Sequence, residues 1–317
     1  MITVTEILQA AERIRPVVRR TPVMTSRSVD ARAGASVFFK CENLQRGGSF
    51  KLRGASNFIL SIPKQDLPRG IVAFSSGNHA QAVAMAARYV GAKATIVMPL
   101  DAPKAKVEGT RAQGAAIVTY DRFKEDREAI GARIAADTGA TLVPPYDHEW
   151  TMAGQGTTCL ELLDEVHDLD ALVVCVGGGG LISGCATAAK AIRPSIRVFG
   201  VEPELANDTY LSIQKGERVE IPPPPTIADG LRSPKPGALT FPVMRKHVES
   251  ILLVSEDEIR EAMRFLLLRM KILVEPSGAV PAAAVLHKLP PGLKRVGVVL
   301  SGGNVDSAQL AGIIAEG

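Results

Sequence analysis

The chain has 317 residues, of which 46% are hydrophobic and 22% are charged, and its formal net charge is +4. This length can bury a full core or form two domains, and so ordinary a composition excludes a disordered chain. The small charge, carried by scattered basic residues without interleaved aromatics, argues against nucleic acid as a partner.

The start of the chain and its cysteines predict a cytoplasmic protein with no membrane contact. Residues 1–18 combine a capping box, Thr3 with Glu6, with helical periodicity, and they lack the basic-then-apolar order of a signal peptide. The long uncharged run 171–189 contains four consecutive glycines, which is untypical of a membrane span. Four cysteines without CxxC spacing indicate buried free thiols rather than a zinc site: Cys41, Cys159, Cys175 and Cys185.

Short runs rich in Val and Ile alternate with helical stretches along most of the chain. Buried parallel strands read as continuous apolar runs, because helices cover both faces of their sheet. We therefore predict an α/β protein with two open, mostly parallel twisted sheets and helices on both faces. Strands are expected in residues 36–42, 70–76, 93–99, 115–120, 141–145, 171–177, 197–203, 250–255 and 295–303, and clear helices in 78–91 and 123–139.

The strand and helix pattern divides the chain into two expected domains. Residues 70–147 contain three strand–helix units and a closing strand, and predict a small domain. Residues 1–69 and 148–317 together predict a large domain. The proline-rich stretch 221–230 has no charge run, so we interpret it as a rigid loop rather than a linker.

The stretch "RGGSFKLRG", residues 46–54, permits two interpretations. Ser49 can cap a helix on which Lys51 faces water, as most lysines do. Alternatively, Lys51 is held at a turn beside Phe50 and is ready to form a Schiff base. These nine residues alone do not choose between the two.

Two strand ends carry residues suited to anions, and ligands of α/β sheets bind at such ends. Residues 75–81, "SSGNHAQ", open a helix whose N–H groups suit a substrate carboxylate, although a simple capped turn would look the same. Residues 175–184, "CVGGGGLISG", let the backbone wrap closely around a phosphate. Neither the Gly-Lys-Ser/Thr of a P-loop nor G-x-G-x-x-G spacing is present, which favours the phosphate of a small cofactor.

Two further strand ends are less informative by themselves. Ser301 in "LSGGN", residues 300–304, ends the last strand at a place where it would point into a cleft. In "VEPELAND", residues 201–208, Glu202 and Asp208 with a free carbonyl between them can hold a hard cation, or they can simply be solvated acids.

Taken together, the motifs resemble the pyridoxal-phosphate enzymes of the serine/threonine dehydratase and serine racemase group. This group has fold type II, which is similar to the tryptophan synthase β fold. The resemblance implies that Lys51 is the Schiff-base lysine and that Phe50 lies beside the pyridine ring. Nearly the whole chain carries the resemblance, in the order "GSFKLRGA", "SSGNHAQ", "AGQGT", "VGGGGLISG", "TIADG", "VEPSGA" and "LSGGN".

The same resemblance implies the remaining cofactor contacts. Asn78 would hydrogen-bond the phenolic oxygen of pyridoxal 5'-phosphate, Ser301 would meet its pyridine nitrogen, and Glu275 would belong to the cofactor site. The residues implied to cradle the phosphate are Gly177, Gly178, Gly179, Gly180 and Leu181.

The resemblance also implies a substrate site and a second base. The substrate-carboxylate loop would consist of Ser75, Ser76, Asn78 and His79, and Arg127 would make a more distant carboxylate contact unless it is an exposed helix residue. Ser76 matches the position of the racemases' second base, opposite the lysine, but dehydratases also keep a serine there.

A divalent cation, Mg²⁺ or else Ca²⁺ or Mn²⁺, is implied at Glu202, Asp208 and the carbonyl of Ala206. A homodimer is expected by analogy. Two departures put activation by ATP in doubt: Tyr146 replaces the racemases' Asn, and Gln113 replaces an aromatic residue. The chain also ends soon after "LSGGN", so we expect no regulatory domain.

The leading functional hypothesis is an L-threonine/L-serine ammonia-lyase (dehydratase) that forms a 2-oxo acid and ammonia by β-elimination. A serine rather than a carboxylate at the pyridine nitrogen makes the ring a weaker electron sink, which favours prompt expulsion of a β-hydroxyl group. The alternatives are a serine racemase, a 3-hydroxyaspartate dehydratase or, outside this class, a non-catalytic nucleotide-binding protein.

Overall fold

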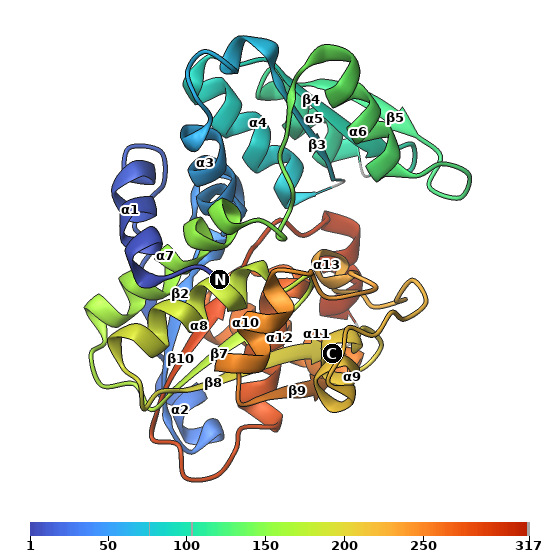
Figure 1. The fold of residues 1–317 in the computed structure, drawn as a ribbon. Helices are drawn as coiled ribbons and strands as arrows, with labels where there is room; N and C mark the ends of the chain where they lie inside the picture. Colours follow the sequence, from blue (N-terminus) through green and yellow to red (C-terminus); the bar gives the residue numbers. More distant parts are fainter. Residues whose placement is uncertain (76, 103, 316–317) are drawn as a thin grey trace.

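The computed structural model describes residues 1–75, 77–102 and 104–315 (Figure 1). Its strands form two sheets. The larger sheet has the strand order β1-β2-β10-β7-β8-β9 and the smaller one has the order β5-β4-β3-β6. Only the edge pair of β1 and β2 is antiparallel among these strand pairs. The predicted class, α/β with two mostly parallel sheets, is therefore confirmed.

The strands coincide with the Val- and Ile-rich runs of the sequence. In β7 all five residues are buried, as expected of a strand covered on both faces. The bounds of the strands are β1 Val23–Met24, β2 Ser36–Cys41, β3 Ile71–Phe74, β4 Ala94–Pro99, β5 Ala116–Tyr120, β6 Thr141–Leu142, β7 Ala171–Cys175, β8 Arg197–Pro203, β9 Ser250–Val254 and β10 Arg295–Leu300.

The helices connect the strands and cover the sheets. Helix α12 packs against strands β7, β8, β9 and β10 of the six-stranded sheet. Helices α7 and α8 pack against each other, α1 packs against α7, and α10 packs against α8. No helix in the described ranges is both long and apolar enough to cross a membrane. The bounds of the helices are α1 Val4–Ile14, α2 Arg27–Ala33, α3 Lys51–Ser61, α4 Asn78–Val90, α5 Lys104–Ala112, α6 Arg127–Thr138, α7 Glu149–Glu165, α8 Gly180–Ile192, α9 Asp208–Lys215, α10 Thr240–His247, α11 Glu256–Phe265, α12 Pro276–His287 and α13 Ser307–Ala315.

Two units are visible in Figure 1, and α3 runs between them. The smaller unit consists of β3 to β6 with α4, α5 and α6, and all its strands fall within residues 70–147. The larger unit is the six-stranded sheet with its helices. Because α3 packs against both α4 and α7, the domain boundaries predicted near residues 69 and 147 remain a prediction.

A buried network of charges fixes α3 to the larger unit. Arg53, on the first turn of α3, is fully buried and donates to both carboxylate oxygens of Glu42, each at 2.8 Å. Its other N–H groups donate to both oxygens of Glu161 on α7, each at 2.7 Å. The buried Lys40 ammonium donates to the same Glu161 at 2.6 Å and to the carbonyl of Thr21 at 2.6 Å. The two positive and two negative charges therefore neutralise one another within the network.

Breaking this network should destabilise the protein strongly. We expect Glu42→Gln to lower the free energy of unfolding by about 3 kcal/mol, because it leaves part of the buried Arg53 charge uncompensated. Urea denaturation of both proteins measures the difference. The matched control is Asp164→Asn in the exposed Arg20–Asp164 pair, which should leave the midpoint nearly unchanged. A Glu42→Gln midpoint equal to that of the parent would contradict the assigned role.

Candidate active site

The turn before Lys51 is hydrogen-bonded to the end of the central strand β10. The N–H of Phe50 donates to the carbonyl of Ser301 at 3.0 Å, and Ser49 pairs with Gly302. Gly48 has a left-handed φ of 72°, and a Cβ there would collide with the amide of Asn304. The turn therefore requires glycine, and it places Lys51 at the first residue of α3, over the strand ends.

The amine of Lys51 lies in a site that favours its neutral form. Burial lowers the pKa of Lys51 to about 8, while the charges of Cys175 and Glu275 oppose this shift. Its Nζ donates to the carbonyl of Pro145 at 2.9 Å and lies 5.2 Å from the centre of the Phe50 ring. A lysine amine is nucleophilic only when neutral, so this site suits covalent chemistry rather than a solvated surface.

The loop of residues 177–180 between β7 and α8 depends on its glycines. Gly179 has a φ of 91°, and a Cβ on Gly178 would collide with the ring of Tyr146. The Thr240 hydroxyl donates to the carbonyl of Gly178 at 2.7 Å, which holds the loop in place. Gly180 and Leu181 begin α8, whose N-terminal N–H groups and dipole attract an anion.

Ser301 and Cys175 lie together at the ends of β10 and β7. Both are buried, and the Ser301 hydroxyl is 3.5 Å from the carbonyl of Ser277. Burial raises the pKa of the Cys175 thiol to about 11, and its hydrogen bond with Ser301 opposes the shift. Cys175 was expected to be a buried thiol, but its place beside Ser301 and Lys51 was not predicted from the sequence.

Asn78 and Glu275 form a hydrogen-bonded pair across the two units. The amide of Asn78, at the start of α4, donates to Glu275 at 2.6 Å and accepts from Asn304 at 2.8 Å. Burial raises the pKa of Glu275 to about 7 with help from Asp229, while Lys106, Asn78 and Lys51 oppose this shift. Asn304 was present in the predicted motif "LSGGN", but no role had been given to it.

The expected substrate loop is partly within the described residues. The Ser75 hydroxyl accepts a hydrogen bond from the N–H of Gly77 at 3.2 Å. His79 is buried with Nε2 3.0 Å from the carbonyl of Val143, and burial together with the charge of Lys51 lowers its pKa to about 3. The imidazole is therefore neutral at physiological pH. Ser76, the expected second base, lies outside the described residues.

Arg127 is less closely associated with the site than the other expected residues. It begins α6, is exposed, and places its guanidinium 5.6 Å from the centre of the Phe74 ring. Its charge acts on Tyr146, whose pKa is raised mainly by burial. Arg127 is thus near the glycine loop through Tyr146, while its carboxylate-binding role remains a prediction.

Glu202 and Asp208 are two fully buried carboxyl groups at the end of β8 and the start of α9. Glu202 accepts the N–H groups of Thr209 at 3.0 Å and Tyr210 at 2.8 Å, whereas both carboxylate oxygens of Asp208 lack a hydrogen-bond partner. Burial raises the pKa of both groups, and the charge of Asp208 adds to the effect at Glu202. Orphaned buried oxygens fit a hard cation.

We propose that a divalent cation binds there, with the carbonyl of the buried Ala206 as a further ligand. Within the described ranges no group of three or more His, Cys, Asp or Glu side chains could hold a metal. The protein would therefore supply two carboxylates and backbone oxygens, which is a ligand set typical of Mg²⁺ or Ca²⁺ and not of zinc.

The lysine site fits pyridoxal phosphate by its shape and chemistry. The Tyr146 ring packs directly on Gly178, where a Cβ would collide with it, and the loop leads into the N-terminal N–H groups of α8, which suit a phosphate. A lysine with a lowered pKa and a neutral hydroxyl on Ser301 face the same strand edge. These features meet the requirements of the cofactor implied by the motifs.

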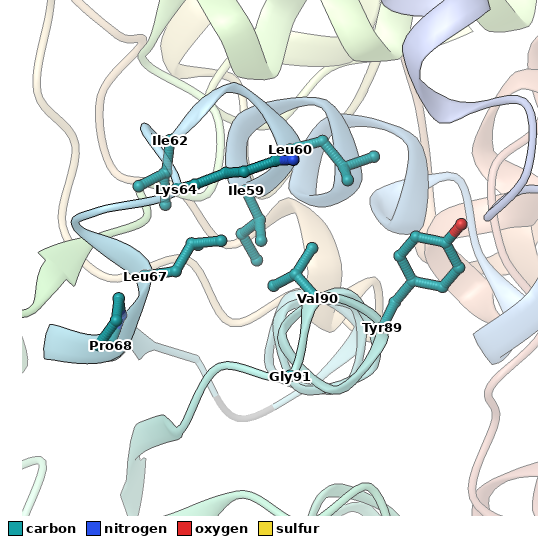
Figure 2. A pocket seen from close by; sticks show the side chains of 9 residues that line it. All are labelled: Ile59, Leu60, Ile62, Lys64, Leu67, Pro68, Tyr89, Val90 and Gly91. Carbon is teal, nitrogen blue, oxygen red and sulfur yellow. The ribbon is translucent and has the colours of Figure 1, made fainter.

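A separate pocket of about 550 Å³ lies at the other end of α3. Figure 2 shows Ile59, Leu67 and Val90 around it, with the Tyr89 ring at one side. None of the predicted site residues lines this pocket, so it belongs to neither the lysine site nor the carboxylate pair.

Comparisons with known proteins agree with the motifs. The family model described as pyridoxal-phosphate dependent enzyme matches residues 14–302. The L-threo-3-hydroxyaspartate ammonia-lyase of a Pseudomonas species is 50% identical over 311 residues, which cover 98% of this chain and 97% of that protein. The serine racemase of Schizosaccharomyces pombe is 46% identical over 315 residues, or 99% and 98% of the two chains. The solved structure of maize serine racemase has a TM-score of 0.95 at 43% identity and covers 99% and 97%.

Burial of Lys51 predicts an unusual dependence of its reactivity on pH. In the cofactor-free protein we expect acylation of Lys51 to reach half its maximum near pH 8, because the neutral amine predominates above this value. The exposed lysines, whose ordinary pKa is about 10.4, should still gain reactivity well above that pH. Brief labelling with acetic anhydride, followed by peptide mass spectrometry, measures both. A Lys51 profile that coincides with the exposed set would refute the assignment.

The proposed cation site predicts a response to chelation. EDTA should lower the melting temperature of the parent protein and Mg²⁺ should restore it, because a ligand that binds only the folded state stabilises it. Glu202→Ala should lower the melting temperature and abolish the response to added Mg²⁺ or Ca²⁺. The control is Glu204→Ala, which removes an exposed carboxylate two residues away. If EDTA leaves the parent's melting temperature and activity unchanged, the cation proposal fails.

Proposed function

The chain belongs to the family of pyridoxal-phosphate dependent enzymes, and we propose that it is an ammonia-lyase for small 3-hydroxy amino acids. The reaction removes the β-hydroxyl group and yields a 2-oxo acid and ammonia. One observation carries the proposal: the Lys51 amine, with a pKa of about 8, faces the strand edge that also holds the glycine loop and the Asn78–Glu275 pair.

When bound, pyridoxal phosphate supplies an electron sink for the pair of electrons released at the substrate's α-carbon. In our proposal, backbone N–H groups of residues 177–181 bind the phosphate with the help of the α8 dipole. Ser301 would offer a neutral hydroxyl to the pyridine nitrogen. A hydroxyl does not favour protonation of that nitrogen, so the ring would withdraw electrons only weakly. A weak sink favours loss of the β-hydroxyl over a long-lived carbanion.

Lys51 is the proposed acid and base on its own face of the substrate. The neutral amine accepts the α-proton, and the hydrogen bond to the carbonyl of Pro145 holds the amine in position beforehand. A general base works best when its pKa is near the working pH, and a value of about 8 meets this condition.

Asn78 is proposed to orient the cofactor's phenolic oxygen. One of its amide hydrogens is directed to Glu275, and its carbonyl oxygen accepts from Asn304, so the amide orientation is defined at both ends. The second amide hydrogen is then available to the ring. The substrate carboxylate would bind beside it, at Ser75 and the N-terminus of α4, where the helix dipole favours an anion.

Three hydroxy amino acids that differ in their side chains are candidate substrates. The motifs of the sequence favour L-threonine or L-serine as the substrate, whereas the Pseudomonas relative is named for L-threo-3-hydroxyaspartate. All three carry the β-hydroxyl group that is eliminated. We place L-threo-3-hydroxyaspartate first, because that relative shares half of its residues with this chain over nearly the full length of both.

Racemisation is the second candidate, and the serine racemases of Schizosaccharomyces pombe and maize favour it. A racemase must return a proton to the face opposite the lysine, and Ser76 matches the position of the residue that does this in racemases. Elimination from an L-amino acid needs only Lys51. Product analysis therefore separates the two activities.

The test is turnover of L-threo-3-hydroxyaspartate, L-serine and L-threonine by the cofactor-loaded protein, with oxo acid, ammonia and D-serine measured together. We expect oxo acid and ammonia in equal amounts and in excess over D-serine. Lys51→Ala should reduce turnover at least about a hundredfold, as expected on loss of a general base, while the exposed Lys246→Ala should retain it. If the protein forms D-serine from L-serine faster than it forms pyruvate, the protein is a racemase and the lyase proposal is wrong.

A further inference from the structure

We propose that Lys106 and Asp229 are positioning residues whose ion pair ties the substrate loop to the segment that flanks the glycine loop. This inference rests on the proposed function, because it concerns how the substrate carboxylate is held relative to the cofactor phosphate. Neither residue was assigned a role by the sequence motifs, although Asp229 lies in "TIADG".

The ion pair bridges the two units of the fold. Lys106 belongs to α5 of the smaller unit, whereas Asp229 begins the short 3₁₀ helix η4, Asp229–Leu231, of the larger unit. Their charged atoms, Nζ and Oδ2, are 2.6 Å apart across 123 residues of sequence. The Lys106 side chain is only 14% exposed and that of Asp229 41% exposed. Because the lysine end is mostly buried, water screens this pair less than a pair in which both side chains are exposed.

The lysine end of the pair lies beside the substrate loop. A Cβ built on Gly77 would be 3.7 Å from the Lys106 Nζ, which is ordinary van der Waals contact. Gly77 caps α4, whose first residue is Asn78, so the Lys106 ammonium lies beside the backbone that presents this helix N-terminus. Movement of Lys106 would therefore move the proposed carboxylate site.

The aspartate end is attached to the glycine loop. The next residue, Gly230, has its carbonyl oxygen 3.3 Å from a Cβ built on Gly177, and its N–H donates to the Ser277 hydroxyl at 2.9 Å. Asp229 is thus held by the backbone that packs on the proposed phosphate cradle. The ion pair consequently sets the distance between the two anion sites of the substrate–cofactor complex.

The same pair acts on the Asn78–Glu275 bond. Glu275 is faced by Asp229 from η4, Lys106 from α5, Asn78 from α4, Lys51 from α3 and Cys175 from β7. Asp229 raises the pKa of Glu275 and Lys106 lowers it, so the paired charges partly cancel. Removing one partner leaves the other acting alone on Glu275. The two single variants should therefore change the ionisation of Glu275 in opposite directions.

The kinetic test uses Lys106→Met, Asp229→Asn, the double variant and Lys106→Arg in the cofactor-loaded enzyme. We expect each neutralising substitution to raise KM about tenfold, equivalent to about 1.4 kcal/mol, with kcat within about threefold of the parent. The double variant should be no worse than the poorer single one, because both lose the same interaction. Lys106→Arg should restore most of the affinity. The control is Arg122→Met in the exposed Arg122–Asp101 pair of the same unit.

The pH dependence provides a signature that a merely structural role would not produce. The acid limb of kcat/KM should move to higher pH in Lys106→Met, where Asp229 is left unneutralised beside Glu275, and to lower pH in Asp229→Asn. The proposal is wrong if the acid limbs of kcat/KM in the two single variants stay in place or move in the same direction. It is also wrong if the effects of the single substitutions on KM multiply in the double variant.

A measurement without turnover separates this inference from the proposed function. Hydrogen–deuterium exchange of the cofactor-loaded protein should accelerate in residues 75–81 and 226–231 of both single variants, and remain parental in Arg122→Met. If the parent protein fails to act on any 3-hydroxy amino acid but this exchange pattern is observed, the proposed function is wrong and the positioning role of the ion pair is still supported. If both segments exchange at the parental rate in both variants, the proposed role of the Lys106–Asp229 ion pair is wrong, whatever the substrate.

Discussion

The active site depends on a helix that is anchored by buried charge. Arg53 on α3 is held by two carboxylates from β2's end and α7, and Lys51 precedes it by two residues on the same turn. A buried guanidinium with bidentate partners permits little rotation or translation of its backbone, since any movement would leave charges unpaired. The lysine therefore reaches the strand ends on a rigid support, while its own side chain donates to the carbonyl of Pro145.

Removal from water then sets the protonation of the site. Burial lowers the pKa of Lys51 to about 8 and of His79 to about 3, and it raises that of Glu275 to about 7. The three pKa shifts share one main cause, because a poorly solvated site disfavours whichever form carries charge. The result is a site in which a basic amine and an acidic carboxyl group coexist near neutral pH, which suits general acid–base catalysis.

Much of this site was predictable because its parts are local. The turn before Lys51, the glycines after β7 and the helix N-terminus at Asn78 each need particular residues within a few positions of one another. The role expected of one long side chain stays a prediction. Arg127 contacts the Phe74 ring at an exposed helix start, where its sequence neighbourhood says nothing about which direction the guanidinium takes.

The sequence by itself determined the α/β class, the two sheets and the family, because apolar periodicity and glycine-rich turns act over a few residues and recur in a readable order. Only the tertiary structure decided which distant groups meet. Glu42 and Glu161 enclose Arg53, Asn304 holds Asn78, and Asp229 pairs with Lys106 of the other unit. No spacing rule encodes these contacts, because each depends on how the strand ends and helices of two units converge in space. The protonation of Lys51 belongs with them, since desolvation is a property of the assembled site and not of any residue in it.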